Sequence, residues 1–161
     1  MNAQEIRRRV EDAGFEFPPV GTPVAAYVPA RICGHEVFVS GQVPWEEVGT
    51  SAMATGLVPD QVDEATAIKA AERCGLFILS GLCDALGDRY ELEAMIKLVG
   101  FVACAPGYGN QPKVINGASE LMVKVLSEDV GRHARSAIGV AGLPLNVPVE
   151  VEAIARIREI G

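Results

Sequence analysis

The chain has 161 residues, 49% of them hydrophobic, so it is long enough to bury a core and is not typical of a disordered segment. Its formal net charge of −7 disfavours nucleic-acid binding, because an acidic protein repels phosphate backbones. No apolar run is typical of a signal peptide or a membrane span. We therefore expect one domain, residues 1–161, in the cytoplasm and away from membranes.

The cysteines and histidines do not form a recognisable metal-binding pattern. No two of the four cysteines have Cys-x-x-Cys spacing, and each lies among apolar residues: Cys33, Cys74, Cys83 and Cys104. We expect reduced thiols packed in a cytosolic core. His35 and His133 have no carboxylates or thiols clustered beside them in the sequence, so we expect no structural metal.

The first predicted element is a short helix within residues 1–14. Asn2 followed by Glu5 resembles a capping box, and Ile6 and Val10 follow at helical spacing. Gly14 would end this helix, because glycine readily adopts the conformation that terminates a helix.

A β-hairpin is predicted next. The β-rich runs 24–32 and 36–40 flank a turn, and Pro29 places the first strand at a sheet edge or a bulge. The sequence Ser40-Gly41-Gln42 would end the second strand. A long loop, residues 44–59, would follow.

The longest predicted helix covers residues 61–86, with Asp60 or Asp63 as its N-cap. Gly75 and Gly81 lower its helix propensity, so we expect them to mark close packing against a sheet. Its apolar residues step by three and four along one stripe: Ala65, Ile68, Ala71, Gly75, Leu79, Leu82 and Leu86.

The rest of the chain alternates strands with one further helix. Residues 92–103 predict a central strand, and the loop 105–112 leads to a helix marked by Val114, Ala118, Leu121 and Val125. Residues 134–140 and 149–156 predict two final strands joined by a tight turn. The simplest packing for this order is an α+β fold, a mixed sheet with two long helices on one face.

Alternation assigns the charges of the last two strands to defined faces. Arg135 shares a face with Ala137 and Gly139, and Glu150 and Glu152 lie opposite the valines of their strand. We expect the valine faces to lie under the helices and the charged faces to point away. One interpretation is a solvated face without function. The other is a small-carboxylate site, because small neighbours leave room beside a guanidinium that binds carboxylates in a bidentate manner.

The spacing of these charges bears on subunit organisation. If the two strands pair around a turn near Pro144, Arg135 falls near Ile154, roughly 13 Å along the ladder from Glu150. Both groups could not then hold one small ligand within a single chain. We therefore expect them to come from different subunits of a closed oligomer.

Two motifs and two single residues carry a resemblance to a known family. The motifs are Phe38-Val39-Ser40-Gly41-Gln42-Val43-Pro44, and Ala134-Arg135-Ser136 with Leu143-Pro144 and Val149-Glu150-Val151-Glu152-Ala153. With Tyr27 and Asn116 at matching positions, the chain resembles the RidA family, also called YjgF-like or endoribonuclease L-PSP-like. The resemblance covers roughly residues 24–157. The N-terminal helix, residues 1–14, and the 44–59 loop are similar to a longer subgroup of the family.

The resemblance implies a chorismate-mutase-like α+β fold and a homotrimer with clefts between its subunits. It implies that Arg135 holds a substrate carboxylate and that Glu150 positions or activates water. The residues that would shape the pocket are Tyr27, Ser40, Gly41 and Asn116. The implied reaction is hydrolysis of a reactive enamine or imine, such as 2-aminoacrylate, to a keto acid and ammonia. It needs no metal or organic cofactor, because the imine carbon is already electrophilic.

Ala137 departs from the family pattern, since many deaminating members carry cysteine two residues after the arginine. The alanine removes any thiol role, slightly enlarges the pocket and leaves the carboxylate clamp intact. The alternative is a non-catalytic trimer that binds a small carboxylate or regulates a partner. A third hypothesis, ribonuclease activity, comes from an older family name, and the net charge of −7 and the lack of a basic groove argue against it.

Overall fold

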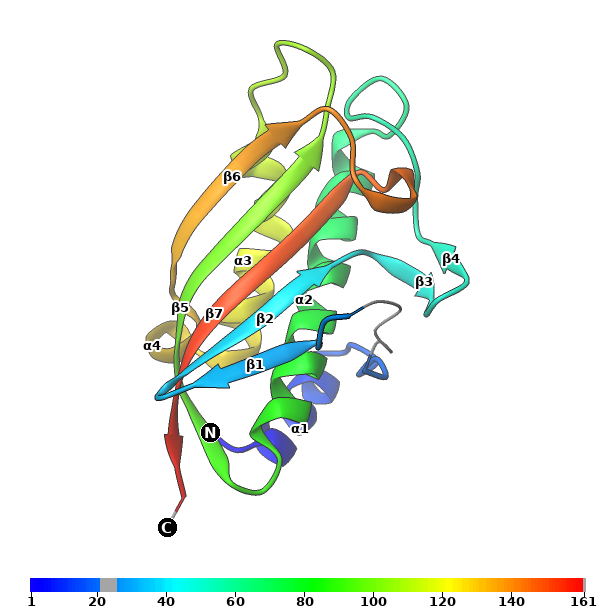
Figure 1. Ribbon diagram of the computed structural model, residues 1–161. Coiled ribbons are helices and arrows are strands. Elements are labelled where there is room, and N and C mark those ends of the chain that lie inside the picture. The colour runs from blue at the N-terminus through cyan, green and yellow to red at the C-terminus, as the bar shows by residue number, and fades with distance from the viewer. Residues whose placement is uncertain (21–25, 161) are drawn as a thin grey trace.

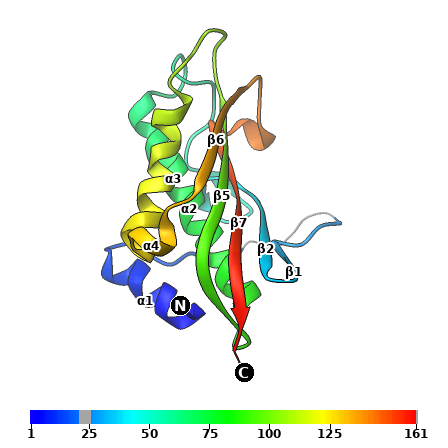
Figure 2. The same cartoon turned by 90° about the vertical axis from the view of Figure 1, so that its left-hand side faces the viewer.

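A computed structural model describes residues 1–20 and 26–160, and its centre is a mixed sheet with two long helices on one face (Figures 1 and 2). The strand order is β1-β2-β7-β5-β6, comprising β1 (Ala30–Cys33), β2 (Glu36–Gln42), β7 (Val149–Glu159), β5 (Tyr90–Ala103) and β6 (Ala134–Val140). The helices are α1 (Ala3–Asp12), α2 (Glu64–Leu86), α3 (Gln111–Leu126) and α4 (Glu128–Gly131), with the 3-10 helix η1 (Pro144–Asn146). No helix among the described residues is long and apolar enough to cross a membrane.

The predicted N-terminal helix is confirmed as α1. The Asn2 side chain accepts a hydrogen bond from the Glu5 N–H at 2.9 Å, which satisfies one of the unpaired donors of the first turn. Gly14 follows the helix with a φ of 89°, a conformation that favours glycine. Ile6 and Val10 are fully buried, so α1 is anchored to the rest of the molecule by packing.

The predicted hairpin is confirmed as β1 and β2, which turn around Gly34. β1 is an edge strand of the sheet, which agrees with the position of Pro29 just before it. The predicted start of this strand, Val24, lies outside the described residues, and β1 itself begins at Ala30.

The prediction that Ser40-Gly41-Gln42 ends the second strand is wrong. β2 continues to Gln42, and its pairing with β7 shifts register between Val39 and Gln42. Gly41 therefore lies in a β-bulge, which changes the direction of the side chains that follow. The predicted loop at 44–59 also contains two short paired strands, β3 (Trp45–Glu47) and β4 (Ser51–Ala52).

The long helix α2 begins after Asp63, one of its two predicted caps, whose carboxylate accepts from the Thr66 N–H at 2.8 Å. Gly81 packs on the sheet as expected, since a Cβ there would lie 3.6 Å from Val39. Gly75 instead faces α3, where a Cβ would lie 2.8 Å from the side chain of Leu121.

The helix α3 lies unusually close to both of its neighbours, and two glycines make this possible. A Cβ on Gly117 would clash with the backbone carbonyl oxygen of Ile68 in α2. A Cβ on Gly100 in β5 would clash with Ile115 of α3, which fills the space above that glycine. These contacts fix the height and the rotation of α3 over the sheet.

The prediction of a closing hairpin is wrong. β5 lies between the last two strands, and it pairs in parallel with β6 and antiparallel with β7. The helix α3 connects β5 to β6, and a crossover of this kind places the second strand parallel to the first. The chain then passes to the other side of β5, so β7 and not β5 is the middle strand of the sheet.

Gly117→Ala should destabilise the protein by about 1–3 kcal/mol or more, because the new methyl group would push the backbone of α3 away from the backbone of α2. Gly142→Ala is the matched control, since a Cβ there meets nothing within 4 Å, and its effect should stay within about 0.5 kcal/mol. Urea unfolding measures both. Equal stability of the two variants would contradict the close approach of α3 to α2.

Candidate functional site

The guanidinium of Arg135 lies between β6 and α3. Its Nη1 donates to Oδ1 of Asn116 at 2.8 Å and to Oγ of Ser119 at 3.0 Å, and both acceptors lie on α3. The side chain is half-buried. The structure therefore brings together two of the residues that the sequence singled out, Arg135 and Asn116.

The prediction that the face of Arg135 points away from the helices is wrong. Arg135 pairs across the ladder with Leu98, which is fully buried under the helices, so both side chains project toward the helical layer. Gly139 lies on the same face, where a Cβ would come within 2.8 Å of the Gln111 side chain. The small residues of β6 thus make room for α3.

Sequence analysis missed Ser119, which accepts a hydrogen bond from this arginine, and His133, which lies beside Ser119. The Ser119 hydroxyl lies 3.0 Å from Nε2 of His133, and Nδ1 of His133 lies 2.7 Å from the Gly131 carbonyl oxygen. The spacing held a signal, since Ser119 lies one helical turn after Asn116 and His133 lies two residues before Arg135. Burial lowers the pKa of His133, the hydrogen bond to Gly131 opposes this, and the charge of Arg135 lowers it further.

A second group of predicted residues lies at β2 and β7. The carboxylate of Glu150 occupies the space that a side chain on Gly41 would need, so the glycine is what admits the carboxylate to this position. Glu150 is half-buried. This burial, with a smaller contribution from the negative charge of Glu152, raises the pKa of Glu150.

Ser40 joins this second group to the segment before β1. Its Oγ donates to the Val28 carbonyl oxygen at 2.7 Å, and its N–H donates to the Pro29 carbonyl oxygen at 2.9 Å. Tyr27 directly precedes this anchored segment and is 52% exposed. Ser40 and Gly41 on β2 and Glu150 on β7 are thus neighbours, and Tyr27 directly precedes the segment that is bound to Ser40.

The two groups do not meet within one chain. Through β5, Arg135 is level with Ala153, not with Ile154 as expected, and Glu150 is level with Ile138. This offset is about three residues, or roughly 10 Å along the strands. Moreover, Glu150 alternates with the buried Val149 and Val151, so it projects from the face opposite to the helices.

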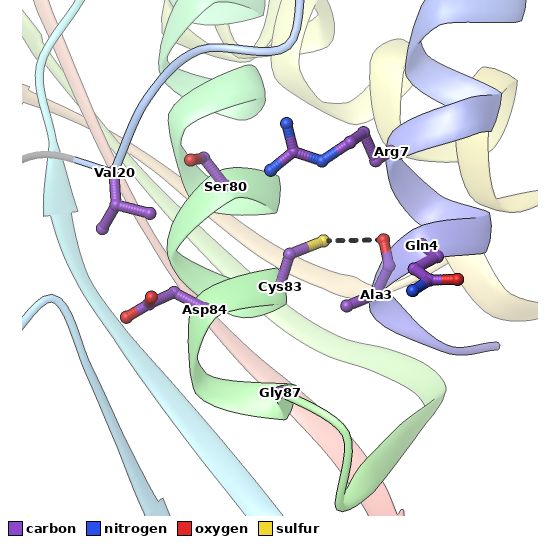
Figure 3. Close-up of a pocket in the computed structure, with 8 residues that line it drawn as sticks. All are labelled: Ala3, Gln4, Arg7, Val20, Ser80, Cys83, Asp84 and Gly87. Atoms are coloured by element: carbon purple, nitrogen blue, oxygen red, sulfur yellow. Dashed lines mark hydrogen bonds between the residues drawn. The ribbon is translucent and has the colours of Figure 1, made fainter.

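The larger of two described cavities lies elsewhere, between α1 and α2 (Figure 3). It has a volume of about 320 Å³, and its polar lining includes Arg7 and Asp84. The thiol of Cys83 points across it to the Ala3 carbonyl oxygen, and burial raises the pKa of Cys83 to about 12, so this thiol is inert near neutral pH. Neither cavity is lined by a predicted site residue. Within the described residues, no three His, Cys, Asp or Glu side chains cluster as metal ligands.

A sequence profile of the Endoribonuclease L-PSP family matches residues 20–157, nearly the stretch that carries the resemblance to RidA proteins. The chain belongs to this family. Protein TCP17 of Trypanosoma cruzi is 36% identical over 152 residues, which are 94% of each chain.

Solved structures agree with this assignment. Atu1372 of Agrobacterium tumefaciens, a protein of unknown function, has 43% identity and a TM-score of 0.85 over 97% of this chain and 94% of its own. A protein from Shewanella oneidensis has 25% identity and a TM-score of 0.85, covering 94% and 98% of the two chains. E. coli TdcF, at 21% identity with a TM-score of 0.57 over 85% and 92%, shows the fold alone. The expected RidA-like α+β fold is confirmed.

Glu150→Gln should raise the melting temperature at neutral pH, because it removes a charge that burial disfavours. The folded state holds the Glu150 proton more tightly than the unfolded state does, because the pKa of Glu150 is raised by folding. The free energy of unfolding of the wild type therefore falls as pH rises above the ordinary pKa of 4.5. The advantage of glutamine should therefore grow with pH and vanish below that value. Thermal unfolding from about pH 4 to about pH 8 measures it.

The exposed Glu46 provides the control for this experiment. Glu46→Gln should change the melting temperature little at any pH in the range. A destabilised Glu150→Gln protein at neutral pH would contradict the burial of the Glu150 charge.

Proposed function

We propose that this protein hydrolyses the C=N bond of a small enamine or imine carboxylate, such as 2-aminoacrylate, in clefts between the subunits of a homotrimer. The observation that carries the proposal is the tethering of Arg135 through a single nitrogen, Nη1. Among the described residues, its Nε and Nη2 make no hydrogen bond. These two nitrogens form a planar edge that suits bidentate binding of a substrate carboxylate.

Glu150 is the proposed proton-transfer group. Its raised pKa makes the carboxylate a better base near neutral pH than an exposed glutamate. An enamine first takes a proton from solvent at its methylene carbon and becomes an iminium ion. Water then adds to the iminium carbon, and Glu150 accepts one water proton and passes it to the nitrogen. The C–N bond then breaks and ammonia leaves, while the proton of the new hydroxyl group returns through Glu150 to solvent and the carbonyl of the keto acid forms, with no need for a metal or an organic cofactor.

A site shared between copies reconciles this chemistry with the geometry of one chain. Arg135 and Asn116 would come from one subunit, and Glu150, Gly41, Ser40 and Tyr27 would come from the next. The sheet face without helices supports the assembly, because it carries Phe38 and Ile138 at 42% and 46% exposure. Large apolar side chains on an uncovered face favour burial against another copy.

A neighbour in the fold comparison is consistent with the proposed substrate class. The crystal structure of E. coli TdcF contains bound serine, a small amino acid with a carboxylate. Ala137 stands where many deaminating relatives have cysteine, so binding of a small carboxylate without turnover is the alternative that the first experiment distinguishes.

Arg135→Ala should lower kcat/KM for 2-aminoacrylate roughly 10- to 100-fold, because charge-assisted hydrogen bonds to the carboxylate are lost. The substrate is generated in place by a serine dehydratase, and the acceleration of pyruvate and ammonia release is measured. Arg135→Lys should fail to restore activity, because an ammonium lacks the planar fork.

Arg8→Ala, at an exposed arginine of α1, is the control and should keep full activity. No acceleration by the wild type would overturn the proposed hydrolysis. Pyruvate binding that depends on Arg135, without turnover, would instead establish the non-catalytic alternative.

Mixing Arg135→Ala with Glu150→Gln subunits should restore activity well above that of either variant alone. In a mixed trimer, one cleft receives Arg135 from one variant and Glu150 from the other. Random assembly at equal amounts makes about three quarters of the trimers mixed, each with about one intact cleft in three, so about a quarter of wild-type activity should return.

Co-expressed and purified mixtures measure this recovery. The control mixes Arg135→Ala with Asn116→Ala, which remove residues of the same half-site and should not complement. If the first mixture stays inactive while the wild type is active, the site is not shared between subunits.

A further inference from the structure

The two acceptors that hold Arg135 differ in one respect. Asn116 offers an amide oxygen, which can only accept a hydrogen bond. Ser119 offers a hydroxyl, which can donate and accept. Its oxygen can accept from Arg135 only when its own proton points elsewhere. The hydroxyl oxygen also lies 3.0 Å from Nε2 of His133.

The proton positions along this chain of hydrogen bonds follow from one fixed acceptor. The Gly131 carbonyl oxygen can only accept, so Nδ1 of His133 must carry the proton at 2.7 Å. In a neutral imidazole Nε2 is then the acceptor, and the Ser119 hydroxyl donates to it. The hydroxyl oxygen is left with its lone pairs toward Nη1 of Arg135, at 3.0 Å.

We propose that Ser119 and His133 are positioning residues that hold the Arg135 guanidinium in one orientation for a substrate carboxylate. The inference rests on the carboxylate-binding role given to Arg135 under the proposed function. Both protons of Nη1 are committed, one to Asn116 and one to Ser119. The incoming carboxylate is therefore received side-on, by Nε and Nη2, and not at the tip of the side chain.

The arrangement requires a neutral His133, and its surroundings favour that state. The elements around it carry these charged residues: Glu91, Glu93 and Lys97 on β5, Lys113, Glu120 and Lys124 on α3, Glu128 and Asp129 on α4, Arg135 on β6, and Arg132 beside it in the sequence. Burial and the charge of Arg135 lower the pKa of His133 against the opposing hydrogen bond to Gly131. A proton on Nε2 would reverse the hydrogen bond to Ser119 and free its hydroxyl proton to turn toward Arg135.

The test measures the Kd of pyruvate by calorimetry on the full-length protein. Ser119→Ala and His133→Phe should each weaken pyruvate binding roughly three- to tenfold, the range for loss of one neutral hydrogen bond. Ser119→Thr keeps the hydroxyl and His133→Gln keeps an acceptor, so both should restore most of the affinity. His35→Phe, at an exposed histidine, is the control and should leave the Kd unchanged.

A merely structural role is separated by repeating the substitutions in the Arg135→Ala background. If Ser119 and His133 act through the guanidinium, they should have no further effect on the Kd there. The double substitution Ser119→Ala/His133→Phe should likewise be no worse than Ser119→Ala alone. Additive losses in either experiment would overturn the inference.

Nitrogen NMR of the unliganded wild type provides a second readout. A protonated Nδ1 and an unprotonated Nε2 on His133 are expected at neutral pH, and the opposite tautomer would overturn the inference. Covalent capture of Ser119 by a fluorophosphonate would also overturn it, since the serine would then be a nucleophile. If pyruvate binding depends on Ser119 and His133 only when Arg135 is present, but no turnover is seen, this inference stands and the proposed hydrolysis fails. If turnover is seen but the effects on binding are independent of Arg135, the hydrolysis stands and this inference fails.

Discussion

The close approach of α3 to both α2 and the sheet is the constraint on which the candidate site depends. Gly117 lets the backbone of α3 touch that of α2, and Gly100 lets Ile115 descend onto β5. With its height and rotation fixed in this way, α3 presents Asn116 and Ser119 to the edge strand β6. The orientation of Arg135 is thus set by packing contacts that do not involve the arginine itself.

On the opposite face of the sheet, the position of Glu150 depends on the backbone of β2. There the bulge in β2 and the missing side chain of Gly41 admit the carboxylate of Glu150 to a half-buried position. Placing a carboxylate there disfavours its charge and so opposes stability near neutral pH. A structural role alone would not require this residue, whereas proton transfer benefits from it.

The elements that depend on local chemistry could be predicted from the sequence. The N-cap at Asn2 and the turn at Gly34 act over a few residues, and the structure contains both. The predicted stripe along α2 is buried from Ala71 onward, whereas Ala65 is exposed and Ile68 is half-buried. The pairing of β6 and β7 could not be predicted, because it depends on α3 carrying the chain across the sheet. Alternation correctly grouped Arg135 with Ala137 and Gly139. It could not say which face the helices cover, since small residues suit a pocket and a close helix equally well.

The same limit explains the candidate site. The resemblance to a family singled out Arg135, Glu150 and Asn116 as candidates, whereas Ser119 and His133 lie beside the arginine only because a helix and a strand meet there. Ser119 and His133 belong to different elements, so the spacing within each element could suggest their proximity to Arg135 but could not establish it.

The separation of Arg135 and Glu150 onto opposite faces of the sheet has one more consequence. No side-chain rotation or loop closure can unite them inside one chain, because the sheet itself stands between them. For a protein that works through both groups, assembly is the event that creates the catalyst, and mass action then governs it. Specific activity would follow protein concentration, falling when the protein is diluted below the dissociation constant of the assembly, without any loss of folded protein.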